Sequence, residues 1–164
     1  MMFIGIDPGK KGAIALFDPS QHDLQIEDMP LVPRPKGKKG EDTNYARLAE
    51  ILCKPSGTRV FALIEDVWSM PKEGVSSAHA FGRNNGALLM GLAAGKIPHA
   101  LITPTKWKKH FGLNRDKGAS RSLAMQRFPD QADLFLRVKD DGRAEAALIA
   151  LYAFEMKGNF GNAA

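Results

Sequence analysis

The sequence predicts an α/β domain built on a mixed five-stranded sheet that is flanked by helices. The first observation is a pair of short apolar runs, Phe3–Ile6 and Ala13–Phe17, separated by the turn-forming segment Pro8–Gly12. Leu24–Met29 can add a third antiparallel strand. The second observation is that strand-like and helix-like segments alternate further along the chain. Three antiparallel strands followed by such alternation are typical of a mixed sheet covered by helices.

The middle of the chain predicts a helix, a central strand and a long helix. Asp42 or Thr43 can cap the first helix, in which the apolar positions are Tyr45, Leu48, Ile51 and Leu52. Val60–Ile64 is an unbroken apolar pentad, which suits a strand buried on both faces. Ser76 or Ser77 can cap the long helix, whose broad apolar stripe runs over Ala78–Ala93 and which Gly95 ends.

The last part of the chain predicts one more strand and three helices. His99–Thr103 reads as a short strand, and two short helices are expected within Pro104–His110 and Lys117–Arg127. The final helix is expected to begin near Gly142. At 164 residues, the length favours one domain, expected over residues 1–157, with 158–164 as a flexible tail.

Composition excludes several classes of protein. A single cysteine, Cys53, rules out an internal disulfide framework and a multi-cysteine zinc site. No apolar run approaches the roughly 20 residues that span a membrane, and the N-terminus lacks the basic start of a signal peptide. We therefore expect a cytoplasmic protein with no membrane partner; for a phage-encoded protein this means the host cytoplasm.

The positive charge is concentrated in one segment. The formal net charge is +5, yet residues 1–95 carry 11 basic and 11 acidic residues. Residues 96–129 carry eight basic residues and a single acid, Asp116, whereas residues 130–164 carry four basic and six acidic residues. A basic block of this kind indicates an anionic partner such as nucleic acid.

Acidic residues stand where the predicted strands and the last helix begin or end. Asp7 ends the first strand, Glu65 follows the apolar pentad, and Asp140, Asp141 and Glu145 lie at the start of the last helix. Taken singly, these are a turn residue, an ordinary strand-end acid and helix caps. Taken together, they predict clustered carboxylates, whose repulsion a divalent cation relieves. Oxygen ligands suit Mg²⁺ or Mn²⁺, and two ions about 4 Å apart can clamp a phosphodiester.

Four motifs resemble the RuvC Holliday-junction resolvases in order and spacing, over nearly the whole chain to about Phe154. The resemblance is closest to the short phage-type members. It implies an RNase H-like fold, a homodimer and Mg²⁺-dependent paired nicking of four-way DNA junctions, which leaves 5′-phosphate and 3′-hydroxyl ends. The motifs are Ile4–Gly9, Ala62–Trp68, Ile102–Lys109 and Asp141–Ala146.

The resemblance also implies roles for individual acids. Asp7 matches the first catalytic aspartate, which is expected to bridge two metal ions, and Glu65 matches the glutamate after the central strand. Glu145 stands where the family carries an aspartate in the last helix.

The fourth acid departs from the family pattern. The bacterial pattern places it three residues before the last acid, and that position is Gly142 here. Asp141 is therefore our predicted metal ligand, with Asp140 as the fallback.

The same resemblance assigns DNA contacts. Trp68 matches an aromatic residue in the loop after the glutamate, where a base can stack on it; the alternative is a tryptophan that anchors the loop. A basic flank is expected to contact DNA phosphates, and three lysines of the Pro30–Gly40 loop are expected to supplement it. The flank consists of Lys106, Lys108, Lys109, Arg115, Lys117 and Arg121, and the loop lysines are Lys36, Lys38 and Lys39. The Ala78–Ala93 helix is the predicted dimer contact, because its apolar stripe is wider than a core needs.

Two other interpretations stay open, and chain length argues against a third. A nuclease of the same fold could act on other branched DNA or on RNA/DNA hybrids. A catalytically inactive junction-binding protein would share the basic surface but need no complete set of acids. Actin-like ATPases have a similar first phosphate loop, but they need two such domains, which 164 residues do not hold. The sequence does not identify a branch-migration partner.

Overall fold

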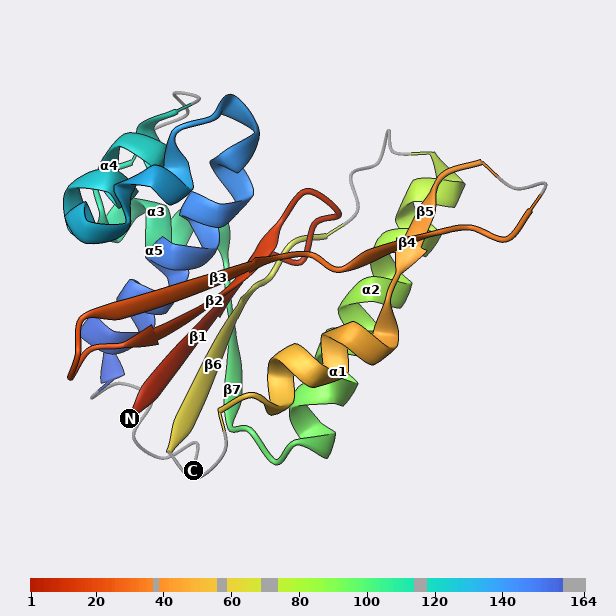
Figure 1. The fold of residues 1–164 in the computed structure, drawn as a ribbon, viewed down its shortest axis with the longest axis horizontal. Coiled ribbons are helices and arrows are strands. Elements are labelled where there is room, and N and C mark those ends of the chain that lie inside the picture. Colours follow the sequence, from red (N-terminus) through yellow and green to blue (C-terminus); the bar gives the residue numbers. More distant parts are fainter. Residues whose placement is uncertain (37–38, 56–58, 69–73, 114–117, 158–164) are drawn as a thin grey trace.

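The computed structural model describes residues 1–36, 39–55, 59–68, 74–113 and 118–157. They are organised around a five-stranded sheet of order β3-β2-β1-β6-β7 (Figure 1). The first three strands of the chain are antiparallel, and β1, β6 and β7 run parallel to one another. The predicted mixed sheet is thereby confirmed. The strands are β1 Met2–Ile6, β2 Ala13–Asp18, β3 Asp23–Asp28, β6 Val60–Glu65 and β7 His99–Ile102.

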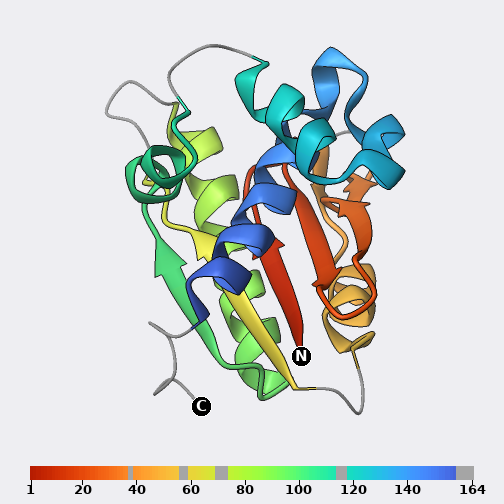
Figure 2. The ribbon, with the colours of Figure 1, turned by 90° about the vertical axis from the view of Figure 1, so that its left-hand side faces the viewer.

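Helices cover both faces of the sheet. α1 (Tyr45–Cys53) and α2 (Val75–Ala94) lie on one face, and α5 (Asp141–Glu155) crosses the other (Figure 2). α4 (Ala119–Arg127) and the 3₁₀ segment η1 (Pro129–Phe135) pack around α5. The remaining elements are α3 Pro104–His110, which follows β7, and η2 Val138–Asp140, which leads into α5. Within the described residues, no helix is both long and apolar enough to cross a membrane.

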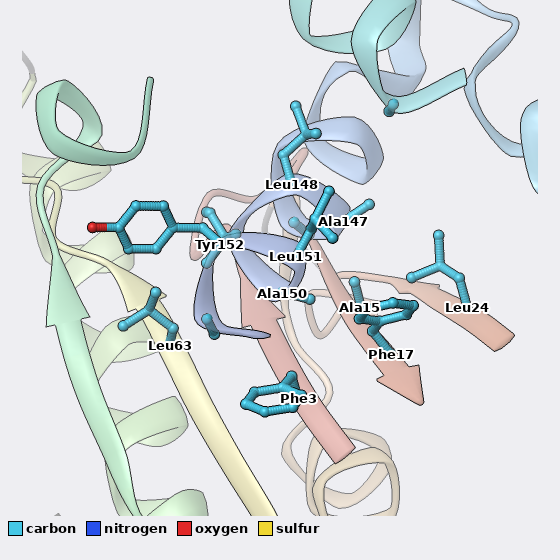
Figure 3. Close-up of a cluster of buried hydrophobic side chains, with 14 of the residues drawn as sticks. Phe3, Ala15, Phe17, Leu24, Leu63, Ala147, Leu148, Ala150, Leu151 and Tyr152 are labelled. Atoms are coloured by element: carbon cyan, nitrogen blue, oxygen red, sulfur yellow. The ribbon is translucent and has the colours of Figure 1, made fainter. Parts of the chain in front are cut away.

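Successive residues of β1, β2 and β6 enter two different cores, because strand side chains alternate between faces. Phe3, Phe17 and Leu63 pack under α5 in the cluster of Figure 3. Ile4 and Ile64, one residue on from Phe3 and Leu63, enter the second core with α1 and α2. This alternation decides which face the side chains at the strand ends take.

α5 lies unusually close to β1. A Cβ atom on Gly5 would lie 2.1 Å from the carbonyl oxygen of Ala146 and 2.3 Å from the backbone nitrogen of Ala150. Only glycine fits there without moving the helix. The small alanines of α5 serve the same end, since Ala146, Ala147 and Ala150 are fully buried.

Two of the predicted helix caps are wrong. Asn44 caps α1, and its side chain accepts a hydrogen bond from the backbone N–H of Arg47. Thr43 instead ends a strand and donates its hydroxyl to Asn84. The N-cap of α2 is Gly74, one residue before the helix begins, so neither Ser76 nor Ser77 caps it.

The segment predicted as a loop between Pro30 and Gly40 is partly a hairpin. β4 (Leu31–Pro33) pairs antiparallel with β5 (Glu41–Thr43) in a separate two-stranded sheet. Alternation over three residues is too short a signal to reveal such strands. The apolar stripe predicted on α2 is also only partly core, because Leu88 and Leu92 are its fully buried apolar members. Residues 158–164, the predicted tail, lie outside the described residues.

The close contact of β1 and α5 gives a stability prediction. Gly5→Ala should lower the free energy of unfolding by about 2–3 kcal/mol, because the added methyl group meets backbone atoms that cannot rotate away. Urea denaturation followed by circular dichroism measures the change. A loss below about 0.5 kcal/mol, the usual effect of a surface substitution, would contradict this contact.

Candidate active site

Asp7 and Glu65 lie side by side at one end of the sheet, on the face that α5 covers. Ile6 pairs with Ile64 in the parallel register of β1 and β6, so the next residue on each strand is an acid. Asp7 continues the alternation of Phe3 and Gly5, and Glu65 continues that of Phe61 and Leu63. The alternation of side chains along each strand therefore directs both carboxylates toward α5.

α5 brings the third acid, Glu145, to this point. Its first turn docks on the β1–β2 turn through an isolated bridge between Gly12 and Gly142. Glu145 lies close enough to raise the pKa values of both Asp7 and Glu65 by charge repulsion. The structure thus brings together three of the predicted acids, from β1, β6 and α5.

Burial is the main influence on these carboxylates. It raises the pKa of Asp7 to about 6, although the Gly9 backbone N–H donates to Asp7 Oδ1 at 3.0 Å and opposes the rise. It raises the pKa of Glu65 to about 7, against a hydrogen bond from Trp107. Repulsion among the three acids adds to both increases. Lys108 lowers both pKa values but does not offset the increases, so nearby positive charge compensates the ionised cluster only in part.

α3 supplies the contacts that hold two of these acids. The indole Nε1 of Trp107, a fully buried residue, donates to Glu65 Oε1 at 2.9 Å. Lys108 Nζ donates to Glu145 Oε1 at 2.7 Å and lies 5.0 Å from the centre of the Trp107 ring. Trp107 was not among our predicted site residues. The sequence feature that could have indicated it is a large aromatic residue between two lysines in a short basic helix.

The two neighbouring aspartates of α5 have different surroundings. Asp140 is 2% exposed and accepts hydrogen bonds from the backbone and guanidinium of Arg137, which hold the pKa of its carboxyl below the usual range. The Asp141 side chain is 48% exposed and accepts from Arg121 Nε at 2.7 Å, one helical turn before Glu145. Asp141 is thus the accessible one of the two.

The absence of an acid at position 142 has a steric cause. A Cβ atom there would lie 2.2 Å from the carbonyl oxygen of Lys11 and 2.7 Å from the Cα atom of Gly12. The docking of α5 on the β1–β2 turn therefore leaves no room for a side chain at Gly142. In this structure an additional acid on α5 must precede that position, as Asp141 does.

The donor chemistry of the cluster fits a hard divalent cation. Asp7, Glu65 and Glu145 offer carboxylate oxygens alone, and two of them are buried with raised pKa values, a condition that a nearby cation relieves. The side chains are not arranged as a complete metal site. In the part of the chain that the structure describes, no three His, Cys, Asp or Glu residues surround one metal position. The carboxylate of Glu145 forms an ion pair with Lys108 instead.

The predicted DNA-contacting residues fall into three groups. Lys106, Lys109, Lys36 and Lys39 are exposed, and Trp68 is 80% exposed, so it does not anchor the loop. Lys108 and Arg121, expected on an open flank, are instead paired with Glu145 and Asp141. Arg115, Lys117 and Lys38 lie outside the described residues.

The sheet order, the helix across one face and the acids at the ends of two adjacent parallel strands define an RNase H-like fold of the RuvC type. Comparison with solved structures confirms the fold. RuvC of T. thermophilus in complex with a Holliday junction substrate matches with a TM-score of 0.63 and 17% identity, over 99% of this chain and 97% of that one. A further Thermus thermophilus RuvC structure matches with a TM-score of 0.59 and 16% identity, over 97% and 96%.

Sequence comparison points in the same direction. The chain is 34% identical over 118 residues to the chloroplastic Holliday junction resolvase MOC1 of Chlamydomonas reinhardtii. The match covers 66% of this chain and 13% of that protein, so the chain spans a small part of this relative's length. No protein-family model matches the chain. The predicted resemblance to RuvC-type resolvases is confirmed in fold and in sequence similarity.

The raised pKa values predict how stability depends on pH in metal-free protein. Because the pKa of Glu65 is higher folded than unfolded, the folded chain binds more protons between about pH 4.5 and 7. Stability therefore falls as pH rises through this window. Glu65→Gln should raise the free energy of unfolding near pH 8 by on the order of 2 kcal/mol and flatten this slope.

The matched control is Glu41→Gln, which removes a charge from an exposed position. Both variants and the unmodified chain are unfolded with urea in the presence of a chelator over a series of pH values. Equal stability of Glu65→Gln and the unmodified chain at alkaline pH would contradict the electrostatic cost.

Proposed function

We propose that this chain is a metal-dependent endonuclease that resolves four-way DNA junctions by paired phosphodiester hydrolysis, leaving 5′-phosphate and 3′-hydroxyl ends. The observation that carries the proposal is the cluster of Asp7, Glu65 and Glu145 at one end of an RNase H-like sheet. The identity to a Holliday junction resolvase supports the choice of substrate. Other nucleases of this fold share the acids, so the junction is the part that experiment must test.

The acids are proposed to hold two Mg²⁺ ions, for which Mn²⁺ can substitute. Asp7, Glu65 and Glu145 are the proposed ligands, together with Asp141. Bound divalent ions would supply a polarised water molecule and neutralise charge on the attacked phosphate. Trp107 fixes the orientation of Glu65, and Lys108 supplies positive charge beside Glu145.

The surface around the acids is proposed to bind the junction. Trp68 follows β6 by three residues and exposes most of its ring, so an unpaired base at the junction centre can stack on it. Lys106 and Lys109 lie on exposed faces of α3, where they can contact phosphates. Lys36 and Lys39 are exposed in the hairpin of β4 and β5, across the β1–β2 turn from α3, and are proposed to contact DNA on that side.

A homodimer through α2 would place two such sites across the two-fold axis of a junction. One face of α2 is exposed and carries Val75, Gly82, Gly86 and Met90. A Cβ atom on Gly82 or Gly86 would meet no atom within 4 Å. Packing within the chain does not explain these glycines, each of which costs a helix about 1 kcal/mol relative to alanine. The close approach of α2 from a second copy of the chain would explain them.

Purified protein should nick four-way junctions in Mg²⁺ or Mn²⁺ and cut linear duplex, three-way or flap structures and RNA/DNA hybrid much more slowly. Asp7→Asn should reduce junction cutting about a thousandfold or more while junction affinity is retained, because it removes a metal ligand and leaves the DNA-binding surface in place. Asp18→Asn, at the half-buried end of β2 and outside the acid cluster, is the control and should cut normally.

Gel assays of labelled substrates distinguish the alternatives. Preferential cutting of flaps or hybrids would replace the junction as substrate. Binding without cutting by the unmodified protein would identify an inactive junction-binding protein, and normal cutting by Asp7→Asn would remove that acid from the mechanism.

The α2 contact predicts the oligomeric state. Gly86→Leu should weaken the dimer at least about tenfold, because the side chain holds the two helices apart. Sedimentation velocity measures the change, with Gln126→Leu on exposed α4 as the control for an added apolar surface. A monomeric unmodified chain, or equal dimerisation of both variants, would refute this interface.

A further inference from the structure

A groove of about 340 Å³ opens beside the β1–β2 turn, on the side away from the basic helices α3 and α4. Its walls are that turn, the start of the hairpin loop after β4, and the first half of α2. In Figure 1 the hairpin and this half of α2 lie on one side of the turn, whereas α3 and α4 lie on the other. The groove holds none of the acids of the candidate active site.

The polar lining of the groove is cationic. Among the described residues, its charged lining residues are Lys10 and Arg34, with no acidic residue, and Ser76 and Ser77 of α2 also line it. Lys10 Nζ donates to the carbonyl oxygen of Glu41 at 2.9 Å, which uses one of its three donors. Arg34 directs Nε and Nη2 to one oxygen of Asp42, which leaves further guanidinium N–H groups for a ligand.

The base of the groove is held by one buried side chain. Asn84, 2% exposed, donates from Nδ2 to the carbonyl oxygen of Pro8 at 2.6 Å and accepts from the Thr43 hydroxyl at 2.8 Å. These two bonds tie α2 to the β1–β2 turn and to β5. The cations are thus mounted on a framework that is already in place, which lowers the cost of ordering on binding.

The groove also adjoins the candidate active site. Gly9 lines it, and the backbone N–H of the same residue donates to Asp7 Oδ1 at 3.0 Å. A DNA strand whose phosphate lies at Asp7 must continue in both directions. Because Gly9 belongs both to the groove lining and to the hydrogen bond on Asp7, the groove lies within reach of a strand that continues from Asp7.

We propose that the groove binds a backbone phosphate of the cleaved DNA strand, next to the phosphate that is attacked, through Lys10 and Arg34. This inference rests on the proposed function for the strand's position at Asp7. The contact positions the strand and carries no sequence information. The strand would therefore be held on both sides of the three acids, by α3 and α4 on one and by this groove on the other.

The test measures binding of a labelled four-way junction to the full chain carrying Asp7→Asn, by fluorescence anisotropy at several salt concentrations. Adding Lys10→Ala should weaken affinity about tenfold and reduce the slope of log affinity against log salt by about one. Lys11→Ala removes the same charge from the adjacent exposed residue, which does not line the groove, and should change affinity less than about twofold. Lys10→Arg, which keeps the positive charge, should bind the junction about as tightly as the protein that retains Lys10.

Single methylphosphonate groups, which remove the charge of one phosphate, locate the contact. A methylphosphonate at one position beside the cut should weaken binding to the protein that retains Lys10. The same methylphosphonate should not weaken binding to Lys10→Ala any further. Ser77→Asp, which places a negative charge in the groove, should weaken binding as well. Equal binding by Lys10→Ala and Lys11→Ala, or methylphosphonate effects that persist unchanged in Lys10→Ala, would overturn the groove. Lack of preference for junctions over duplex would instead overturn the proposed function, since the comparison of Lys10 with Lys11 holds on any DNA that the chain binds.

Discussion

The gathering of three carboxylates at the end of two parallel strands, two of them with pKa values raised chiefly by burial, is the main electrostatic constraint on this protein. Asp7 and Glu65 are adjacent in register, and α5 adds Glu145 against the same point. Burial raises the pKa values of two of them, and Lys108, which pairs with Glu145, supplies positive charge beside them. A fold selected for stability alone would not place them together. Their cost to the metal-free chain is the physical reason to expect a divalent cation, and it connects the fold with hydrolysis of phosphodiesters.

Glycines make this arrangement possible by letting backbones meet. Gly5 allows α5 to contact β1, and Gly12 with Gly142 docks the first turn of that helix beside Asp7. The same contact closes position 142 to any side chain, so the departure from the family pattern at this residue follows from packing. Asp141 remains accessible one residue earlier, whereas Asp140 is engaged by Arg137. Close packing and placement of the acids are thus one constraint.

The alternation of apolar and polar residues, together with the apolar runs, was sufficient to predict the sheet and the major helices. The alternation of side chains along β1 and β6 also puts both strand-end acids on one face of the sheet. Local pattern could not show pairing partners. The strands β4 and β5 are three residues long and depend on contacts across the hairpin, and the capping role fell to Asn44 because Thr43 bonds Asn84 instead. The ion pairs of Lys108 and Arg121 with acids, and the hydrogen bond from Trp107 to Glu65, depend on how α3 and α4 pack beside α5.

We propose that Asp7, Glu65 and Glu145 form a site for divalent cations. Titration of Mn²⁺ into the chelator-treated full chain, followed by calorimetry or by the electron paramagnetic resonance of free Mn²⁺, measures binding at this site directly. We expect saturable binding to the unmodified chain, its loss in Asp7→Asn and Glu145→Gln, and its retention in Asp140→Asn, whose carboxylate is engaged by Arg137. Equal Mn²⁺ binding by the unmodified chain and Asp7→Asn would contradict this proposal.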